Sequence, residues 1–240
     1  MRPRRSPRRS SRPSLRHERP DGSTRPPSRT PLRTLVARRV DPAAAREVAA
    51  AYDDARERRD PLTRAAYARL VAESDRLFGW MTSPDRADPV RVAFTACRTP
   101  YDDARELIDS VRDERTLEVA TVATDAGRRH PLMGSDRGGA YDRFRAVHDV
   151  LGHACLGLGF DRDAEFTAWR WQERLHSPLA HRALATELHG QHSVLWTTGR
   201  VAEPKAVLLD PELVERSRRR ARPTEPSRNR EARVAEPFLP

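Results

Sequence analysis

The chain has 240 residues and a formal net charge of +10, with 45 Lys and Arg residues against 35 Asp and Glu residues. Residues 1–31 carry a net charge of +8 and residues 216–240 one of +5, which leaves about −3 for residues 32–215. A region with that balance has no basic face of the kind that binds nucleic acid. Nucleic-acid binding is therefore expected only through the two basic tails. No apolar run approaches the length of a membrane span, so no membrane partner is expected.

The length of the chain suits one domain of ordinary size flanked by tails. Residues 1–31 are a low-complexity stretch of Arg, Pro and Ser, which predicts a disordered tail. Residues 32–215 are expected to form a single, mainly helical domain, and residues 216–240 a second disordered, Arg-rich tail. The two cysteines, Cys97 and Cys155, are far apart and do not make a disulfide framework, so a cytoplasmic location is expected.

Helix-start signals open the central region. Asp41-Pro42 and Asp60-Pro61 each place a capping carboxylate before a proline that suits the first helical turn. The second of these helices is expected to run to about Phe78. Because only a few residues separate the two helices, they are predicted to form a helical hairpin.

The remaining elements follow from hydrophobic periodicity. Two short strands are predicted at 90–94 and 117–122, with a helix between them that starts at Thr99-Pro100. A polar, Gly-containing loop over 125–139 precedes the central helix. Further helices are expected over these ranges: 140–157, 163–175, 178–196 and 212–217. The fold class is therefore mainly α (α+β), with a minor small β-sheet.

The central helix contains His148, Asp149 and His153, which are potential metal ligands and proton carriers. In a regular α-helix, residues i and i+5 point about 140° apart, which would separate the two imidazoles. A π-bulge brings i+5 back onto one face, and such bulges are frequent at functional sites. A ligand at the end of the helix would also solve the problem. Gly152 permits either solution and lets another group approach closely.

Glu187 is predicted to complete a metal site with His148 and His153. Two imidazoles and one carboxylate on one side of a metal ion are typical of non-haem Fe(II) enzymes. The same ligands with a bound water would suit a zinc hydrolase. The candidates for catalytic roles around these ligands are Asp149, Gln191 and His189.

Four further residues are candidates for the lining of the pocket: Arg145, Glu165, Trp169 and His192. His192 is also a spare candidate for a ligand or a proton shuttle. Each assignment has a structural alternative. Arg145 can form an ion pair with Asp149 one turn later, Trp169 can belong to the core, and Glu187 can pair with an arginine.

The segments FRAVHDVLGHACLGLGF and AEFTAWRWQERLHSPLAHRALATELHGQHS resemble an uncharacterised family of bacterial and phage proteins. This resemblance extends from about 41 to 209 and is most specific over 144–193. It implies an architecture but no particular activity.

The segment from His148 to His153, HDVLGH, is also similar to the iron-binding motif of the pterin-dependent aromatic amino acid hydroxylases. Glu187 stands near the place of the glutamate ligand in that family, slightly earlier in the chain. The similarity implies a mainly helical catalytic fold, Fe(II) and oxygen-dependent hydroxylation of a small-molecule substrate. The Thr-Pro-Glu-Pro segment of those hydroxylases is absent here, which makes pterin and an aromatic amino acid substrate doubtful.

The leading hypothesis is thus a non-haem Fe(II) oxygenase, or hydroxylase-like enzyme, that acts on a small substrate. The first alternative is a hydrolase or phosphohydrolase that depends on zinc or manganese. The second is a non-catalytic helical module that contacts a partner or a nucleic acid through its tails.

Overall fold

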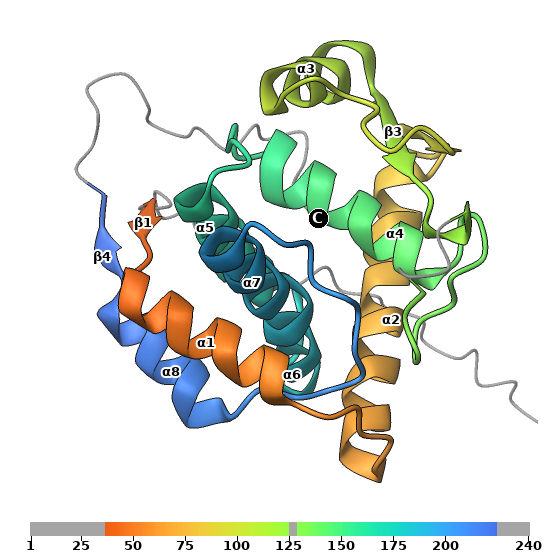
Figure 1. The fold of residues 1–240 in the computed structure, drawn as a ribbon. Helices are drawn as coiled ribbons and strands as arrows, with labels where there is room; N and C mark the ends of the chain where they lie inside the picture. The colour runs from red at the N-terminus through yellow and green to blue at the C-terminus, as the bar shows by residue number, and fades with distance from the viewer. Residues whose placement is uncertain (1–36, 125–128, 225–240) are drawn as a thin grey trace, which may run out of the picture. The chain divides into compact units, whose positions relative to one another are not determined.

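The computed structural model describes residues 37–124 and 129–224 of the chain (Figure 1). This part is mainly helical and has a minor β component, so the predicted fold class is confirmed. The predicted tail 1–31 and the loop residues 125–128 lie outside the described residues, as does most of the second tail. None of the described helices combines the length and the apolar character that crossing a membrane requires.

The α-helices of the domain are α1 (Pro42–Asp54), α2 (Pro61–Thr82), α3 (Ala104–Asp109), α4 (Ala140–Val147), α5 (Arg162–Gln172), α6 (Pro178–Leu184), α7 (Gln191–Thr198) and α8 (Pro211–Arg220). Segments of π-helix continue some of these helices, namely η1 (Ser110–Glu114), η4 (His148–Ala154) and η6 (Ala185–Gly190). Short 3₁₀ turns occur at η2 (Val122–Thr124) and η5 (Glu173–Leu175).

Both predicted helix starts are present. The side chain of Asp41 accepts a hydrogen bond from the backbone N–H of Ala44, and that of Asp60 accepts one from the N–H of Thr63. These bonds satisfy N–H groups that a helix leaves without partners in its first turn. The second helix runs four residues beyond the predicted Phe78 and ends at Thr82.

The predicted hairpin of α1 and α2 is wrong. α1 packs on α7 and α8, whereas α2 packs on α4 and α6. Figure 1 shows α2 turning away from α1 after the short connection between them. The apolar stripes of the two helices are therefore buried against different partners, which a short connection does not prevent.

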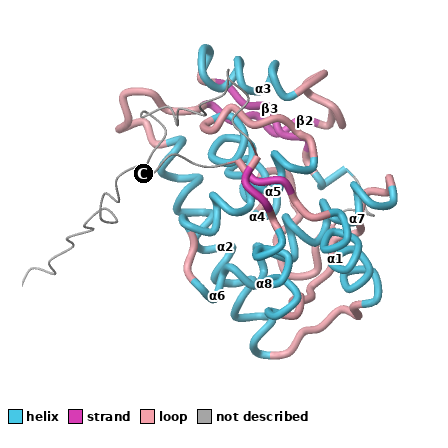
Figure 2. The backbone as a smooth tube through the Cα atoms, turned by 90° about the vertical axis from the view of Figure 1, so that its left-hand side faces the viewer, coloured by secondary structure: helices cyan, strands magenta, loops and turns pink. Residues whose placement is uncertain are grey.

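Two small sheets complete the domain. β2 (Arg91–Thr95) and β3 (Thr116–Ala120) form a parallel pair at the two predicted strand positions. Figure 2 shows this pair beside α3, at one end of the helical part. β1 (Arg38–Arg39) pairs antiparallel with β4 (Arg222–Pro223). Ordered structure therefore continues past residue 215, the predicted end of the domain, through the rest of α8 and into β4.

The core consists of two clusters of buried apolar side chains. One lies among α1, α2, α5, α6 and α7, and the other lies among the end of α2, the β2–β3 pair, α3 and η4. The predicted core stripe of the central helix is confirmed, since Phe144, Val147, Leu151 and Ala154 are all buried. α5 packs against both η4 and η6. α5 also contacts α7, so the segments that carry His148, His153, Glu165 and His192 are brought together inside the domain.

Candidate metal centre

His148 and His153 lie on the same side of their helix because the backbone is π-helical between them. The segment η4 begins at His148 and includes His153. The Nε2 atoms of the two imidazoles are 3.0 Å apart, and the rings meet at 87°. The bulge that the i, i+5 spacing requires is therefore present.

Gly152 is needed for this arrangement because the His148 ring folds back over it. A Cβ atom at position 152 would lie 3.0 Å from Nδ1 of His148 and 3.3 Å from the side chain of Ala168. Both separations are tighter than ordinary contact, so a side chain at this position would push the imidazole or α5 outward.

Glu165 supplies the carboxylate that lies against these histidines. α5 starts with Asp161, whose side chain caps the backbone N–H groups of Asp163 and Ala164, and Glu165 follows in the first turn. Its Oε2 atom is 3.1 Å from Nε2 of His148 and 3.3 Å from Nε2 of His153. The carboxylate is buried with only 10% of its side chain exposed.

His192, in the first turn of α7, contributes a third imidazole. Its Nδ1 atom is 3.1 Å from Oε2 of Glu165. His148, Glu165 and His192 each place one potential ligand atom within 4.8 Å of the other two. Nδ1 of His192 is buried and has no hydrogen-bond partner in the described part of the chain, because its short contact with Glu165 lacks hydrogen-bond geometry. Two ligands of one metal ion approach each other in this way without sharing a hydrogen bond.

The outer nitrogens of His148 and His153 face carbonyl oxygens. Nδ1 of His148 is 2.8 Å from Oε1 of Gln172, and Nδ1 of His153 is 3.3 Å from the backbone oxygen of Leu158. A carbonyl oxygen only accepts, so each Nδ1 carries a hydrogen. Each Nε2 faces Oε2 of Glu165, to which it donates when the ring is protonated, and in the neutral ring its lone pair is available to a metal ion. Metal-binding histidines are commonly oriented by acceptors placed in this way.

The end of the π-helix is held by Arg112 from η1. Its guanidinium group donates to the backbone oxygens of Ala154 at 2.7 Å and Cys155 at 3.2 Å. These carbonyls lie at and just after the C-terminal end of η4, where that of Ala154 accepts only a long backbone hydrogen bond, of 3.4 Å, from Gly157. The contact therefore stabilises the segment that carries both histidines.

The electrostatics of the cluster favour a cation. Burial opposes protonation of His153, but the carboxylates of Glu165 and Asp149 outweigh it and raise the pKa of His153 to about 9. Burial acts to raise the pKa of Glu165, but the imidazoles of His192 and His153 outweigh it and hold that pKa well below its usual range. Burial lowers the pKa of His192, against the opposing effect of Glu165. A site that retains a proton so strongly also suits a divalent cation in its place.

The distances also fit a metal ion. For metal–ligand bonds of about 2.1 Å, adjacent donors are separated by about 3.0 Å around an octahedral ion and about 3.4 Å around a tetrahedral one. The Nε2 atoms of His148 and His153 are 3.0 Å apart. Oε2 of Glu165 lies 3.1 Å from the nearest nitrogen of His148, 3.3 Å from that of His153 and 3.1 Å from that of His192. We refer to these four residues as the His/Glu cluster.

Glu187, predicted as the carboxylate ligand, lies among other partners. Its Oε1 atom accepts a hydrogen bond from the hydroxyl of Tyr67 at 2.7 Å and lies 3.2 Å from Nε2 of His130. Its Oε2 atom accepts from the amide of Gln191 at 2.6 Å. Gln191, one turn after Glu187, thus orients its carboxylate. The carboxylate that the structure brings to His148 and His153 is that of Glu165.

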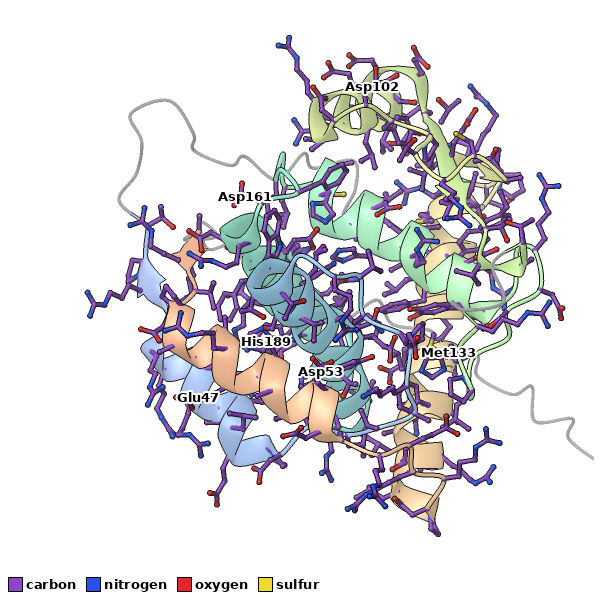
Figure 3. All side chains as sticks on the ribbon, in the orientation of Figure 1. Glu47, Asp53, Asp102, Met133, Asp161 and His189 are labelled. Atoms are coloured by element: carbon purple, nitrogen blue, oxygen red, sulfur yellow. The ribbon has the colours of Figure 1, made fainter. Side chains whose placement is uncertain are left out.

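His189 is buried in the domain interior (Figure 3). It stacks on Trp169 with ring centroids 4.5 Å apart. Its ring nitrogens face the hydroxyls of Ser217 at 2.8 Å and Ser193 at 3.5 Å. Burial lowers the pKa of His189 to about 3, so the ring is neutral. These contacts are those of a core histidine.

The other predicted residues divide between the site and the scaffold. Asp149 is half-buried beside the cluster, and burial raises its pKa against the opposing charges of His148 and Arg145. Arg145 donates to the backbone oxygen of Ala120 on β3. Trp169 is fully buried in the core.

Some residues around the site were not among the predicted ones. Gln172 orients His148, Tyr67 and His130 bind Glu187, and Arg162 enters the pocket beside Glu165 and His192. The glycines at 157 and 159 were the one sequence feature that could have indicated which residues lie near His148 and His153. A chain that reverses there brings the following helix back along η4, and residues early in α5 are then placed near His148 and His153.

No protein-family model matches the chain, and no curated protein or solved structure is detectably similar to it. The resemblances noted in the sequence therefore stay predictions, and the site itself carries the functional argument.

Proposed function

We propose that the domain is a metal-dependent enzyme of the non-haem iron type, in which the His/Glu cluster binds one Fe(II) ion. The observation that carries this proposal is that Oε2 of Glu165 lies 3.1 to 3.3 Å from nitrogens of three imidazoles, two of which are 3.0 Å from each other. In this assignment Glu165 takes the ligand role that the sequence suggested for Glu187. The proposed activity is the oxygen-dependent hydroxylation of a small substrate.

Iron is the proposed metal for two reasons. Imidazole and carboxylate ligands suit Fe(II), and the HDVLGH segment resembles an iron-binding motif. When bound, the ion supplies the redox chemistry that hydroxylation requires, and an ion that accepts six ligands keeps positions beyond the four protein donors. The residues of the His/Glu cluster do not indicate pterin. The experiment below therefore uses ascorbate as the reductant.

The chain's own residues have defined tasks in this proposal. Gln172 and the Leu158 carbonyl hold the two imidazoles of η4 in the orientation that aims Nε2 inward. Asp149 is the proposed proton donor or acceptor, because its raised pKa lets a carboxyl group retain a proton closer to neutral pH. The ring of Phe160 lies edge-on to His153, with centroids 5.1 Å apart, and shields that ligand from water.

A hydrolase that uses zinc is the second candidate. The longest contact, 3.3 Å between Glu165 and His153, approaches the spacing of about 3.4 Å expected for tetrahedral ligands around zinc. The task of the metal would then be to activate a bound water molecule for attack.

The test uses the full chain, purified without oxygen and loaded separately with Fe(II), Zn(II) or Mn(II). Oxygen uptake with ascorbate as reductant is measured over a panel of small organic substrates, and hydrolysis is measured with p-nitrophenyl phosphate and p-nitrophenyl acetate. Uptake by the Fe(II) form that disappears in Glu165→Gln, but persists in Glu187→Gln, is the expected result. Hydrolysis by the Zn(II) or Mn(II) form without oxygen uptake would transfer the assignment to the second candidate. Failure to bind any metal would leave a helical interaction module.

A further inference from the structure

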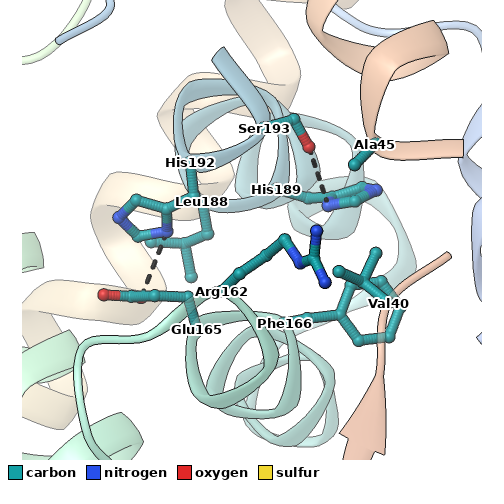
Figure 4. A pocket seen from close by; sticks show the side chains of 9 residues that line it. All are labelled: Val40, Ala45, Arg162, Glu165, Phe166, Leu188, His189, His192 and Ser193. Carbon is teal, nitrogen blue, oxygen red and sulfur yellow. Dashed lines mark hydrogen bonds and ion pairs between the residues drawn. The ribbon is translucent and has the colours of Figure 1, made fainter. Parts of the chain in front are cut away.

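A cavity opens beside the His/Glu cluster (Figure 4). Glu165 and His192 form one side of it, and the apolar side chains of Val40, Phe166 and Leu188 form much of the rest. Its enclosed space is only about 10 Å³, although about 250 Å³ lies between its walls and the open mouth. The closed part therefore holds about one water molecule or one small polar group.

Arg162 brings a positive charge into this cavity. Figure 4 shows its guanidinium group extending between the Glu165–His192 side and the side formed by Val40 and His189. The Nε atom of Arg162 is buried and has no hydrogen-bond partner among residues 37–124 and 129–224. A buried donor without a partner is unfavourable, and because 37% of the Arg162 side chain is exposed, its guanidinium group remains open to a partner from outside the described chain.

The neighbouring carboxylates do not fill that role. Oδ1 of Asp163 forms an ion pair with Nε of Arg162 at 3.6 Å, a separation too long for a hydrogen bond. Its Oδ1 atom accepts a hydrogen bond from the backbone of Val40, and its Oδ2 atom faces Arg39 at 3.5 Å. Glu165 is engaged by the three imidazoles of the cluster.

The far side of the cavity offers no competing negative charge. His189 is neutral there, because burial lowers its pKa to about 3, and Ser193 lies 3.5 Å from its ring. A ligand that enters the cavity therefore meets the charge of Arg162, with Glu165 and its three imidazoles on the other side.

We propose that this cavity binds the carboxylate group of a small organic acid, with Arg162 as its principal partner. The proposal rests on the proposed function, since it names the substrate class of the metal site. A guanidinium group pairs with a carboxylate through two parallel hydrogen bonds, which neutral donors of the same size do not match. The apolar walls suit a short hydrocarbon body.

The dimensions limit the acid. The enclosed space admits one small polar group, so a carboxylate can enter it while the rest of a short acid lies toward the open mouth. A single arginine and so little closed space also favour a carboxylate over a phosphate, which presents more oxygens and more charge. A molecule held by Arg162 shares its cavity with Glu165 and His192 and is thereby placed beside the metal ligands.

The experiment uses the full chain loaded with Co(II), whose visible spectrum reports on the surroundings of the metal. Propanoate is the probe, and propanamide is its neutral counterpart of nearly equal size. The variants are Arg162→Gln and, as a matched control, Arg174→Gln, which changes an exposed arginine just after α5 that does not line the cavity. Thermal unfolding of each variant verifies that the fold is retained, and calorimetric titration measures propanoate binding with and without metal.

We expect a saturable spectral change with propanoate and none with propanamide. Arg162→Gln should weaken propanoate binding by about 10- to 100-fold, as expected for losing a charged hydrogen-bonded pair, and Arg174→Gln should leave it unchanged. Equal binding by the wild type and Arg162→Gln would overturn the role of Arg162 and place the carboxylate on the metal alone. Absence of propanoate binding to a protein that does bind Co(II) would overturn this inference but leave the metal site standing. Failure to bind Co(II) would instead count against the proposed function. Calorimetric titration of the metal-free protein with propanoate would then test the carboxylate site separately.

Discussion

The Nε2 atoms of His148 and His153 lie 3.0 Å apart, although the two residues are five positions apart in one helix. A regular α-helix would turn them about 140° away from each other. The π-helical segment η4 removes that divergence. It also brings together two imidazoles whose outer nitrogens are already held by carbonyl groups, so that their lone pairs converge. Converging lone pairs repel each other unless a proton or a metal ion lies between them.

The first prediction concerns Gly152. In Gly152→Ala the new methyl group would lie 3.0 Å from Nδ1 of His148, so the ring must move away from Gln172. We expect metal affinity to fall by about 10- to 100-fold, as for other changes to groups that orient metal ligands. Competition with a chromophoric chelator measures this affinity. Gly79→Ala is the control, because a Cβ atom at that exposed position of α2 meets nothing within 4 Å. Equal affinities for the two variants would show that the His148 orientation does not depend on Gly152.

The second prediction separates Glu187 from metal binding. In Glu187→Gln, one oxygen becomes an amide donor, which must then face the hydroxyl of Tyr67, the ring of His130 or the amide of Gln191. A buried mismatch of this kind should lower the free energy of unfolding by about 1–3 kcal/mol. Urea unfolding of the metal-free protein measures it, with Glu57→Gln at an exposed position as the control. The metal content of Glu187→Gln should stay at the wild-type level, and an unfolding free energy equal to that of the control would show that this network does not stabilise the domain.

The third prediction concerns acid stability. Burial lowers the pKa of His189 to about 3, whereas an unfolded histidine has a pKa of about 6.5. Because the folded pKa is the lower one, the stability that the neutral ring contributes is present above about pH 6.5 and is lost as the pH falls from there toward 3. One such group gives a slope of about 1.4 kcal/mol per pH unit.

The variant His189→Gln should remove about one group's share of this slope. Burial also lowers the pKa of His176, which acts in the same direction, so part of the slope should remain. Urea unfolding in the presence of a chelator, between about pH 6.5 and pH 5, measures the slopes. That range lies above the usual titration of carboxyl groups. Identical slopes for the wild type and the variant would contradict the assignment of His189 as a neutral core histidine.

Local chemistry made much of the fold predictable from the sequence. Asp41-Pro42 and Asp60-Pro61 start helices because a carboxylate and a proline satisfy the requirements of a first turn without help from the rest of the chain. The packing of α1 and α2 was not predictable in this way. Each helix packs on elements that are distant from it in the sequence, and the short connection between the two helices does not determine these partners.

The candidate site was predictable only in part. The sequence identified His148 and His153 and the condition under which they can meet, because the helical angle follows from spacing alone. The choice between Glu165 and Glu187 depended on how α5 and η6 are rotated about their axes, which spacing does not fix. Arg162 was missed because one more arginine in an Arg-rich chain carries no signal until a cavity forms around it.

The metal content of the purified protein decides whether His148, His153, Glu165 and His192 bind a metal ion. The full chain and its Glu165→Gln and Glu187→Gln variants are purified without oxygen, reconstituted with Fe(II), freed of unbound metal and analysed by mass spectrometry of the elements. We expect about one metal ion per chain in the wild type and in Glu187→Gln, and a nearly complete loss in Glu165→Gln. Metal retained in Glu165→Gln but lost in Glu187→Gln would contradict the ligand assignment. A wild-type chain that binds no metal after reconstitution would contradict the metal centre itself.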